Sequence, residues 1–307
     1  MNNSMILHHY ESSPYAEKIR LMFGLTDSTW YSLISPVWPP RSNIDPLSGG
    51  YRRIPVGQIG ADIFCDSSLI ANEISRLTGN KAISPSSITG HAKSLMLRAE
   101  GDVFFAAIGA IPPRRALTTM LLKFGPVGTY RFIKDRSKLL TGGSSRTPGT
   151  SKATSIFTSF LSDLEQHLSE NTYINGDLPS VADFATYHPL WLHVSVKRGA
   201  IDAGPAVQQW FDKIGHIGHG QQQNITQADA FAAARDANPR SLPTSDGTEE
   251  IELGSTVQVA PLDYGVVPVQ GELAAVTDER IILARATIDF GTVHVHFPRE
   301  GYGMTAQ

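Results

Sequence analysis

The spacing of hydrophobic residues changes twice along this chain of 307 residues, and this change constrains the fold more than any other feature. Over residues 1–80, short alternating segments are interleaved with segments whose apolar residues recur every three or four positions. The helical spacing alone continues over residues 90–235, and alternation replaces it over residues 251–307. The sequence therefore predicts three regions in order: an α/β domain, an all-α domain and a small C-terminal β module.

The first region is predicted to fold in the order β-α-β, then a long loop, then β-β-α. The expected strands lie at 5–10, 29–34, 53–58 and 61–66, and the expected helices begin at Pro14 and Ser67. Pro14 suits the first position of a helix, because the N–H that a proline lacks would have no partner there in any case. The segment 35–50 is rich in Pro, Ser and Gly, which predicts the long loop.

The other two regions are predicted from the same kinds of pattern. Helices are expected at 90–110, 115–124, 130–140 and 152–169, and two more begin at Ser180 and near Pro205. Residues 236–250 predict a linker, and strands are expected at 271–276, 281–286 and 292–297. A β unit as small as residues 251–307 is marginal alone. We therefore expect it to dock on the helical domain or on a partner subunit, through the strand face that carries Val293, Val295 and Phe297.

Charge and cysteine content exclude several classes of function. The chain has 26 Lys and Arg against 29 Asp and Glu, a net charge of −3, so no surplus of cations is available for a nucleic acid. A single cysteine, Cys65, excludes an internal disulfide and a zinc site built from several cysteines. No apolar run reaches the ~20 residues of a membrane span, and the N-terminus lacks the pattern of a signal peptide. We therefore expect a cytoplasmic protein with no nucleic-acid or membrane partner.

Three segments of the first region carry a family resemblance. Residues 12–20 read SSPYAEKIR, residues 52–56 read RRIPV and residues 65–70 read CDSSLI. In this order, they resemble the N-terminal, thioredoxin-like domain of the glutathione transferase superfamily, and the first segment is most similar to the tau and omega types. The resemblance implies glutathione as co-substrate with no other cofactor, a small electrophile as second substrate, a homodimer and a role in detoxification.

The helical region is similar to the second domain of the same family. Its marker is the segment 180–183, SVAD, which resembles the family's capping motif. The Ser180 hydroxyl would accept the N–H near Asp183, and Asp183 would accept the N–H of Ser180, so the motif is a folding device. Residues 251–307 lie outside the two standard domains of the family, and their segments 263–265 and 296–299 resemble a tail module found on a bacterial subset.

The resemblance places the thiol chemistry at the start of the first helix. A thiol with a pKa of about 8.5 is mostly protonated at neutral pH, and lowering that pKa by about two units takes roughly 2.7 kcal/mol. A hydroxyl hydrogen bond to a charged sulfur supplies ~1.5–3 kcal/mol, and a helix N-terminus adds up to ~1 kcal/mol. Ser13, immediately before Pro14, is the leading candidate for this catalytic hydroxyl, and Ser12 is the alternative. Either serine could instead serve only as the helix cap.

The other two segments imply a binding site for glutathione. In this fold the proline of Ile54-Pro55 is cis rather than the ordinary trans, and the Ile54 backbone would pair with the cysteinyl backbone of glutathione. Ser67 and the helix N-terminus suit the γ-glutamyl carboxylate, and Asp66, where the family usually has Glu, would face the ammonium. Arg53 could pair with the glycyl carboxylate. The alternatives are that Asp66 or Ser67 only caps the helix and that Arg53 is solvated.

The histidines and the single cysteine give only weak indications of a metal site or a nucleophile. His294 and His296 share one face of an expected strand, and His216 and His219 are one helical turn apart. Neither pair has an evident third ligand, so no metal site is expected. Cys65 lies away from the start of the first helix, where a nucleophilic thiol would gain from the helix dipole, and is interpreted as a packing residue.

Two other functions stay open beside a glutathione transferase. One is a non-catalytic glutathione-binding or scaffold protein that kept the fold, and the other is a glutathione-dependent lyase or isomerase. The fold does not decide among them. In each enzymatic case the second substrate would bind between the first two domains, in a pocket lined partly by the helix expected at 90–110.

Overall fold

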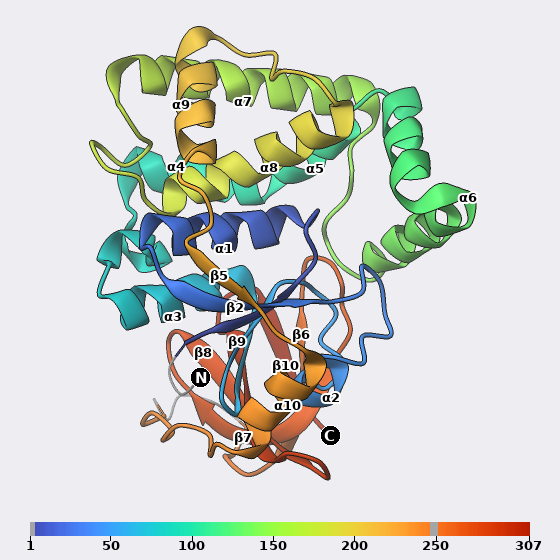
Figure 1. Ribbon diagram of the computed structural model, residues 1–307, viewed down its shortest axis with the longest axis vertical. Coiled ribbons are helices and arrows are strands. Elements are labelled where there is room, and N and C mark those ends of the chain that lie inside the picture. The colour runs from blue at the N-terminus through green and yellow to red at the C-terminus, as the bar shows by residue number, and fades with distance from the viewer. Residues whose placement is uncertain (1–3, 246–250) are drawn as a thin grey trace.

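A computed structural model describes residues 4–245 and 251–307 and confirms an α/β domain, a helical domain and a further strand-rich C-terminal region (Figure 1). The N-terminal domain has the predicted order β-α-β, β-β-α. The exception is one short helix inside the predicted loop, whose first turn contains Asp45 and Pro46, residues that favour a helix start. The elements are β1 (Ile6–His9), α1 (Pro14–Leu25), β2 (Thr29–Ile34), α2 (Asp45–Ser48), β3 (Val56–Ile59), β4 (Asp62–Cys65) and α3 (Ser67–Thr78).

The helical domain differs from the prediction at one break and agrees with it at another, since the sequence predicts that helices separate between residues 124 and 130. A single helix over 90–110 is wrong, because Gly101, with φ −95° and ψ −113°, separates two helices. In α6, Gly125 has φ 65° and ψ 178°, since the residue before Pro126 is pushed out of the helical conformation. This element therefore has two helical limbs. The elements are η1 (Lys81–Ile83), η2 (Pro85–Ser87), α4 (Gly90–Glu100), α5 (Asp102–Gly109), α6 (Pro113–Leu139), α7 (Thr150–Glu170), α8 (Val181–Lys197) and α9 (Pro205–Gly215).

The predicted capping box at the start of α8 is confirmed. The Asp183 carboxylate accepts the backbone N–H of Ser180 at 2.9 Å and the Ser180 hydroxyl at 3.0 Å. It also accepts the N–H of Ile174 and the indole N–H of Trp210, both at 2.9 Å. Because Asp183 is completely buried, this one carboxylate joins α8 to the loop before it and to α9.

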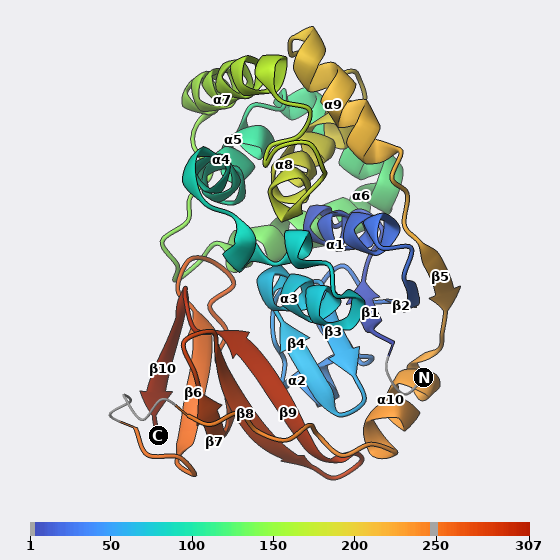
Figure 2. The same ribbon diagram turned by 90° about the vertical axis from the view of Figure 1, so that its left-hand side faces the viewer.

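One sheet of ten strands runs through the α/β domain and the C-terminal region, in the order β10-β6-β7-β8-β9-β4-β3-β1-β2-β5 (Figure 2). Of the predicted linker 236–250, the described part contains no helix or strand, and residues 246–250 lie outside the described residues. The remaining elements are β5 (Gln221–Asn224), α10 (Gln227–Arg235), β6 (Thr256–Pro261), β7 (Val269–Val276), β8 (Arg280–Thr287), β9 (Gly291–Pro298) and β10 (Tyr302–Ala306).

The predicted docking of the C-terminal β region is wrong in its location. Its strand β9 pairs in parallel with β4, with Val295 opposite Ile63, so the region extends the sheet of the thioredoxin-like domain. The predicted apolar face is nevertheless buried, because Val293, Val295 and Phe297 are all 0% exposed, and both histidines of the opposite face are buried as well. The free edge of β4 thus supplied a hydrogen-bonding partner that the helical domain could not offer.

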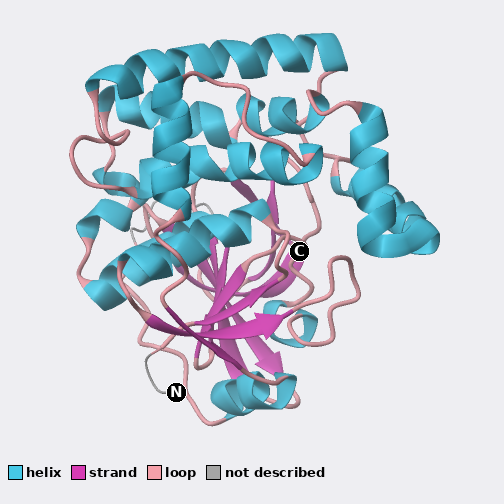
Figure 3. Ribbon diagram, turned by 45° about the horizontal axis from the view of Figure 1, so that its top comes forward, coloured by secondary structure: helices cyan, strands magenta, loops and turns pink. Residues whose placement is uncertain are grey.

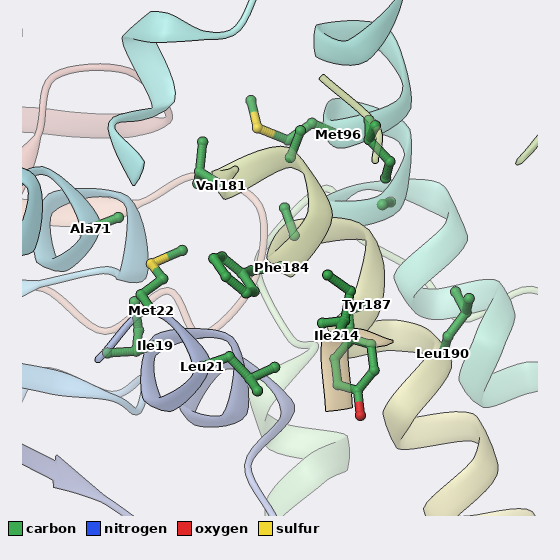
Figure 4. Close-up of a cluster of buried hydrophobic side chains, with 14 of the residues drawn as sticks. Ile19, Leu21, Met22, Ala71, Met96, Val181, Phe184, Tyr187, Leu190 and Ile214 are labelled. Carbon is green, nitrogen blue, oxygen red and sulfur yellow. The ribbon is translucent and has the colours of Figure 1, made fainter. Parts of the chain in front are cut away.

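Two of the three hydrophobic cores among the described residues hold these parts together, and Figure 3 shows the helical layer beside the strands. The first core joins α1 and α3 to the helical domain, where Met22 of α1 lies near Phe184 of α8 (Figure 4). The second core is shared by the N-terminal domain and the C-terminal strands and includes Ile54, Ile63 and Val295. Segments from all three regions are therefore fixed around the site described next.

Candidate functional site

The start of α1 brings Ser12 and Ser13 to a cavity of about 400 Å³ between the thioredoxin-like and helical domains. Ser13 is the N-cap residue, 1% exposed, and its hydroxyl oxygen accepts the N–H of Ala16 at 3.2 Å. A serine hydroxyl that accepts one hydrogen bond still has its own hydrogen to donate. The capping role therefore exists, and it leaves Ser13 able to donate to a sulfur atom in the cavity.

The peptide bond between Ile54 and Pro55 is cis, as expected. Ile54 also lines the cavity. Within the described residues, neither its N–H nor its C=O forms a hydrogen bond. An extended peptide can add to such free backbone groups as a short strand. The backbone of Ile54 is thus available for the role that the resemblance implies.

Asp66 and Ser67 lie where β4 ends and α3 begins. Asp66 is the N-cap residue, and its Oδ1 accepts the N–H and the hydroxyl of Ser68, both at 3.0 Å. Its φ of 82° costs a non-glycine residue about 1–3 kcal/mol, and such strain clusters at functional sites. Asp66 therefore caps the helix with one carboxylate oxygen and keeps the other, Oδ2, for further partners.

Those further partners include residues of the C-terminal region. Arg53 Nη1 lies 3.5 Å from Asp66 Oδ2, and Arg53 Nη2 forms an ion pair with Asp263. The Arg53 guanidinium also donates to the Tyr264 carbonyl at 2.6 Å and lies 3.9 Å from the centre of the Tyr264 ring. The Tyr302 hydroxyl donates to Asp66 Oδ2 at 3.2 Å. The two side chains expected to hold opposite ends of glutathione thus contact each other and the C-terminal region.

The charge state of Asp66 follows from these contacts. Burial raises the pKa of its carboxyl, but the Arg53 charge and the hydrogen bonds from Ser68 outweigh burial and hold that pKa below its ordinary value. Asp66 is therefore ionised at neutral pH, as the binding of an ammonium group requires. An incoming ammonium would share this carboxylate with Arg53.

The loop between β6 and β7, residues 262–268, carries Asp263 and Tyr264 into the site. The connection between α6 and α7 holds this loop, because the Ser145 N–H donates to the Asp263 carbonyl at 2.9 Å. The N–H of Gly265 donates to the Leu139 carbonyl at 2.6 Å. A side chain at position 143, now glycine, would clash with the same Asp263 carbonyl. The loop is thus clamped between the thioredoxin-like and helical domains.

The cavity has an apolar wall and a cationic end. At the cationic end, Arg52 and Arg136 share one carboxylate, Asp135, at 2.6 and 3.2 Å. Within the described chain, the buried Arg41 guanidinium donates to backbone carbonyls alone, and burial together with the Arg52 charge lowers its pKa to about 10. Three cations against two carboxylates, Asp135 and the Asp45 whose charge acts on Arg41, favour a ligand with an anionic group. The apolar wall includes Phe104, Phe105, Ile108, Phe124 and Trp191.

The histidine pairs take structural partners. His296 Nε2 lies 2.8 Å from Asp62 Oδ1, and His219 Nε2 lies 3.2 Å from Glu17 Oε1. Among the residues that the structure describes, no three His, Cys, Asp or Glu side chains are grouped for metal binding. Cys65 is buried, and burial raises the pKa of its thiol well above the ordinary value, which fits a packing role.

Two family models match the chain: "Glutathione S-transferase, N-terminal domain" over residues 7–82 and "Glutathione S-transferase, C-terminal domain" over residues 156–216.

Residues 7–82 and 156–216 therefore carry the N- and C-terminal domains of the glutathione S-transferase family.

The first match contains Ser13, Ile54 and Asp66, and the second contains the capping box of α8. This family and its fold support a glutathione-binding, transferase-like function. In addition, no helix of the described chain is long and apolar enough to cross a membrane.

Solved structures include a relative that spans the whole chain. A GST-like protein from Pseudomonas syringae is 29% identical, with 99% of this chain and 100% of that chain covered, at a TM-score of 0.79. A glutathione S-transferase from Xanthobacter autotrophicus is 16% identical, with 69% of this chain and 93% of that chain covered, at a TM-score of 0.43. One from Rhodospirillum rubrum is 14% identical, with 68% of this chain and 87% of that chain covered, at a TM-score of 0.48. No curated protein matches the chain. The match to the Pseudomonas protein therefore includes the strand-rich C-terminal region.

Proposed function

We propose that this chain is a glutathione-dependent transferase that joins the sulfur of glutathione to an apolar electrophile. The observation that carries the proposal is the position of Ser13, a buried hydroxyl at the N-terminus of α1 that lines the same cavity as Ile54. A sulfur bound between these residues would accept a hydrogen bond from Ser13 and lie near the positive end of the helix dipole.

Each part of the site then has one task. The Ile54 backbone pairs with the cysteinyl backbone of glutathione, and Ser67 with the N-terminus of α3 binds the γ-glutamyl carboxylate. The thiol releases its proton to solvent, and Ser13 stabilises the resulting thiolate. The thiolate then attacks the electrophilic carbon, a C–S bond forms, and the leaving group departs with its electron pair. The aromatic wall of the cavity, which includes Phe104 and Trp191, excludes water from the electrophile.

The glycyl carboxylate of glutathione is assigned to the cationic end of the cavity rather than to Arg53. Arg53 already faces Asp66 and Asp263, whereas Arg41 lacks a carboxylate partner within the described residues. A buried guanidinium gains more from an incoming anion than a paired one does. Arg41 therefore replaces Arg53 in this role, and Arg136, which already pairs with Asp135, adds positive charge beside it.

Replacing Ser13 by Ala is expected to raise the pKa of the bound thiol and to lower kcat for chlorodinitrobenzene by about 10- to 100-fold, because one hydrogen bond to the thiolate is lost. The affinity for glutathione should change little. The measurements are a pH–rate profile and calorimetric titration with glutathione. The matched control is Ser12→Ala, and melting temperatures of both variants separate the loss of the helix cap from the loss of catalysis. A larger loss in Ser12→Ala would exchange the two roles, and full activity in both variants would refute the mechanism.

The contacts of Arg53 favour a second candidate, a non-catalytic binding or scaffold protein. Asp263 and Tyr264 hold Arg53, and Tyr302 donates to the Asp66 oxygen that the ammonium of glutathione would approach. In this arrangement the γ-glutamyl end of glutathione has to displace both the Tyr302 hydroxyl of β10 and the β6–β7 loop.

Replacing Asp263 by Ala is expected to tighten glutathione binding by about tenfold, because the loop loses an ion pair that competes with the ligand. Calorimetric titration with glutathione measures this directly. Asp278→Ala, an exposed acidic residue on the same β region, is the matched control and should leave the affinity unchanged. Failure of the wild type, Asp263→Ala and Tyr264→Ala to bind glutathione would favour the scaffold function.

A further inference from the structure

Helix α6 exposes more large apolar side chains than any other helix of the described chain. Its two limbs project at the right-hand edge of the molecule in Figure 1. The most exposed of these side chains are Leu122 at 68%, Tyr130 at 67% and Val127 at 66%, and Leu117, Leu121 and Ile133 are exposed as well. Single exposed apolar residues are ordinary on a protein surface, but six on one element indicate a contact surface.

Helix α6 also carries mostly positive charge. The helix contains seven Lys and Arg and one acid, Asp135, so its net charge is +6 in a chain whose total is −3. Asp135 is partly buried against Arg52 and does not offset the exposed cations. No carboxylate of the described chain forms an ion pair with any of these cations. The exposed cations are Arg114, Arg115, Lys123, Arg131, Lys134 and Lys138.

The inner side of α6 is a wall of the cavity. Met120, Phe124 and Phe132 line the cavity from this helix. The inner side is also fixed to the protein, because the Thr119 hydroxyl donates to the Val196 carbonyl at 2.8 Å and Arg136 donates to the Tyr10 hydroxyl at 3.1 Å. The cavity is thus separated from the exposed face by the thickness of one helix.

We propose that the outer face of α6 binds the surface of an anionic lipid bilayer. Lys and Arg interleaved with Leu, Val and Tyr are the composition of helices that lie in a membrane interface, where cations meet anionic headgroups and apolar side chains enter the acyl boundary. This revises the expectation of no membrane partner, which rested on the lack of a spanning segment. That criterion does not detect a local cationic and apolar surface.

A second copy of the chain is the competing occupant, and charge argues against it. In a twofold-symmetric dimer the same surface meets itself, so two such cationic faces would repel each other. A bilayer with anionic headgroups instead complements the five exposed cations of α6 that do not line the cavity, all of those above except Lys123. Membrane binding also places the cavity beside the phase in which apolar electrophiles concentrate, although the proposal does not depend on glutathione chemistry.

Co-sedimentation of the full-length protein with vesicles tests the proposal. Binding is expected to vesicles of phosphatidylcholine with phosphatidylglycerol, to weaken with added salt and to be much weaker with phosphatidylcholine alone. The triple variant R131E/K134E/K138E should lose at least about a hundredfold in partition coefficient. The charge-matched control is K93E/K152E/K213E, three exposed cations on other helices, and it should lose only a few-fold. Leu122→Ser should weaken binding roughly tenfold at unchanged charge.

Melting temperatures of all variants verify that these surface changes leave the fold intact. No binding to the anionic vesicles, or equal losses in the two triple variants, would overturn the proposal. So would light scattering that shows a dimer which Leu122→Asp dissociates, because the face would then belong to a second copy.

Discussion

A chain that ends after Asp246 is expected to melt at least about 10 °C below the full-length protein and to aggregate on concentration. The truncation removes β9 from the edge of β4 and opens the second core, in which Ile63, Val295 and Phe297 are all 0% exposed. Each large apolar side chain returned to water costs about 1.5–3 kcal/mol. In a protein of this size, 1 kcal/mol lowers the melting temperature by about 2–4 °C.

Calorimetry and light scattering measure these two effects. In the full-length chain, Val295→Asp should reproduce much of the loss, because it places a charge opposite Ile63 inside the core. The matched control is Ile288→Asp, at a residue that is fully exposed, and it should leave the melting temperature unchanged. An unchanged melting temperature and solubility in the truncated chain would show that the C-terminal region is an independent appendage.

Short-range signals explain why much of the fold could be predicted. Pro14 and the capping pair of Ser180 and Asp183 each act within a few residues, so their structural consequence is visible in the local sequence. The alternation of β9 likewise predicted that its Val and Phe face is buried, but it did not predict that the opposite face, which carries two histidines, is buried too. The alternating sequence could not predict the strand with which β9 pairs, because the same pattern is compatible with pairing at any sheet edge.

The site was predictable only where it lies in a single segment. Ser13 and Ile54 sit in local motifs, and the structure brings both to one cavity. Arg41 carried no such signal, since it reaches the site through a loop whose sequence has no hydrophobic period. Tyr264 lies in the segment that resembles a tail module, but nothing in that segment indicated that it reaches the site. Strand β5 was not predicted for a related reason. All four of its residues are exposed, so it has no apolar pattern, and it is held by backbone pairing with β2.

Replacing Glu73 by Gln is expected to lower the melting temperature by about 5–10 °C at neutral pH. The Glu73 side chain, 2% exposed on α3, contacts Arg76 at 2.8 Å and both Arg240 and Arg280 at 3.0 Å. Because Arg280 lies on β8, this carboxylate joins the thioredoxin-like domain to the C-terminal region. Removing one partner from a buried ion cluster costs about 3–5 kcal/mol.

The effect of Glu73 should depend on pH in a defined direction. Burial raises the pKa of its carboxyl, but Arg240, Arg76 and Arg280 outweigh burial and lower that pKa from 4.5 to about 2. A carboxylate with a lowered pKa stabilises the fold fully above its unfolded value of 4.5, and this contribution is lost as the pH falls towards 2. The shift corresponds to roughly 3 kcal/mol. The melting temperatures of the wild type and Glu73→Gln should therefore differ most above about pH 5 and converge below it.

Two arginine variants separate the link between domains from a local effect on α3. Arg76→Gln removes a side chain that is 50% exposed and should cost less than about 1 kcal/mol. Arg280→Gln removes the contact to β8 and should lower the melting temperature about as much as Glu73→Gln does. The double variant Glu73→Gln with Arg280→Gln should then lose less than the sum of the single losses, because both remove the same ion pair. Additive losses, or a Glu73→Gln effect that is the same at every pH, would show that Glu73 does not join the C-terminal region to α3.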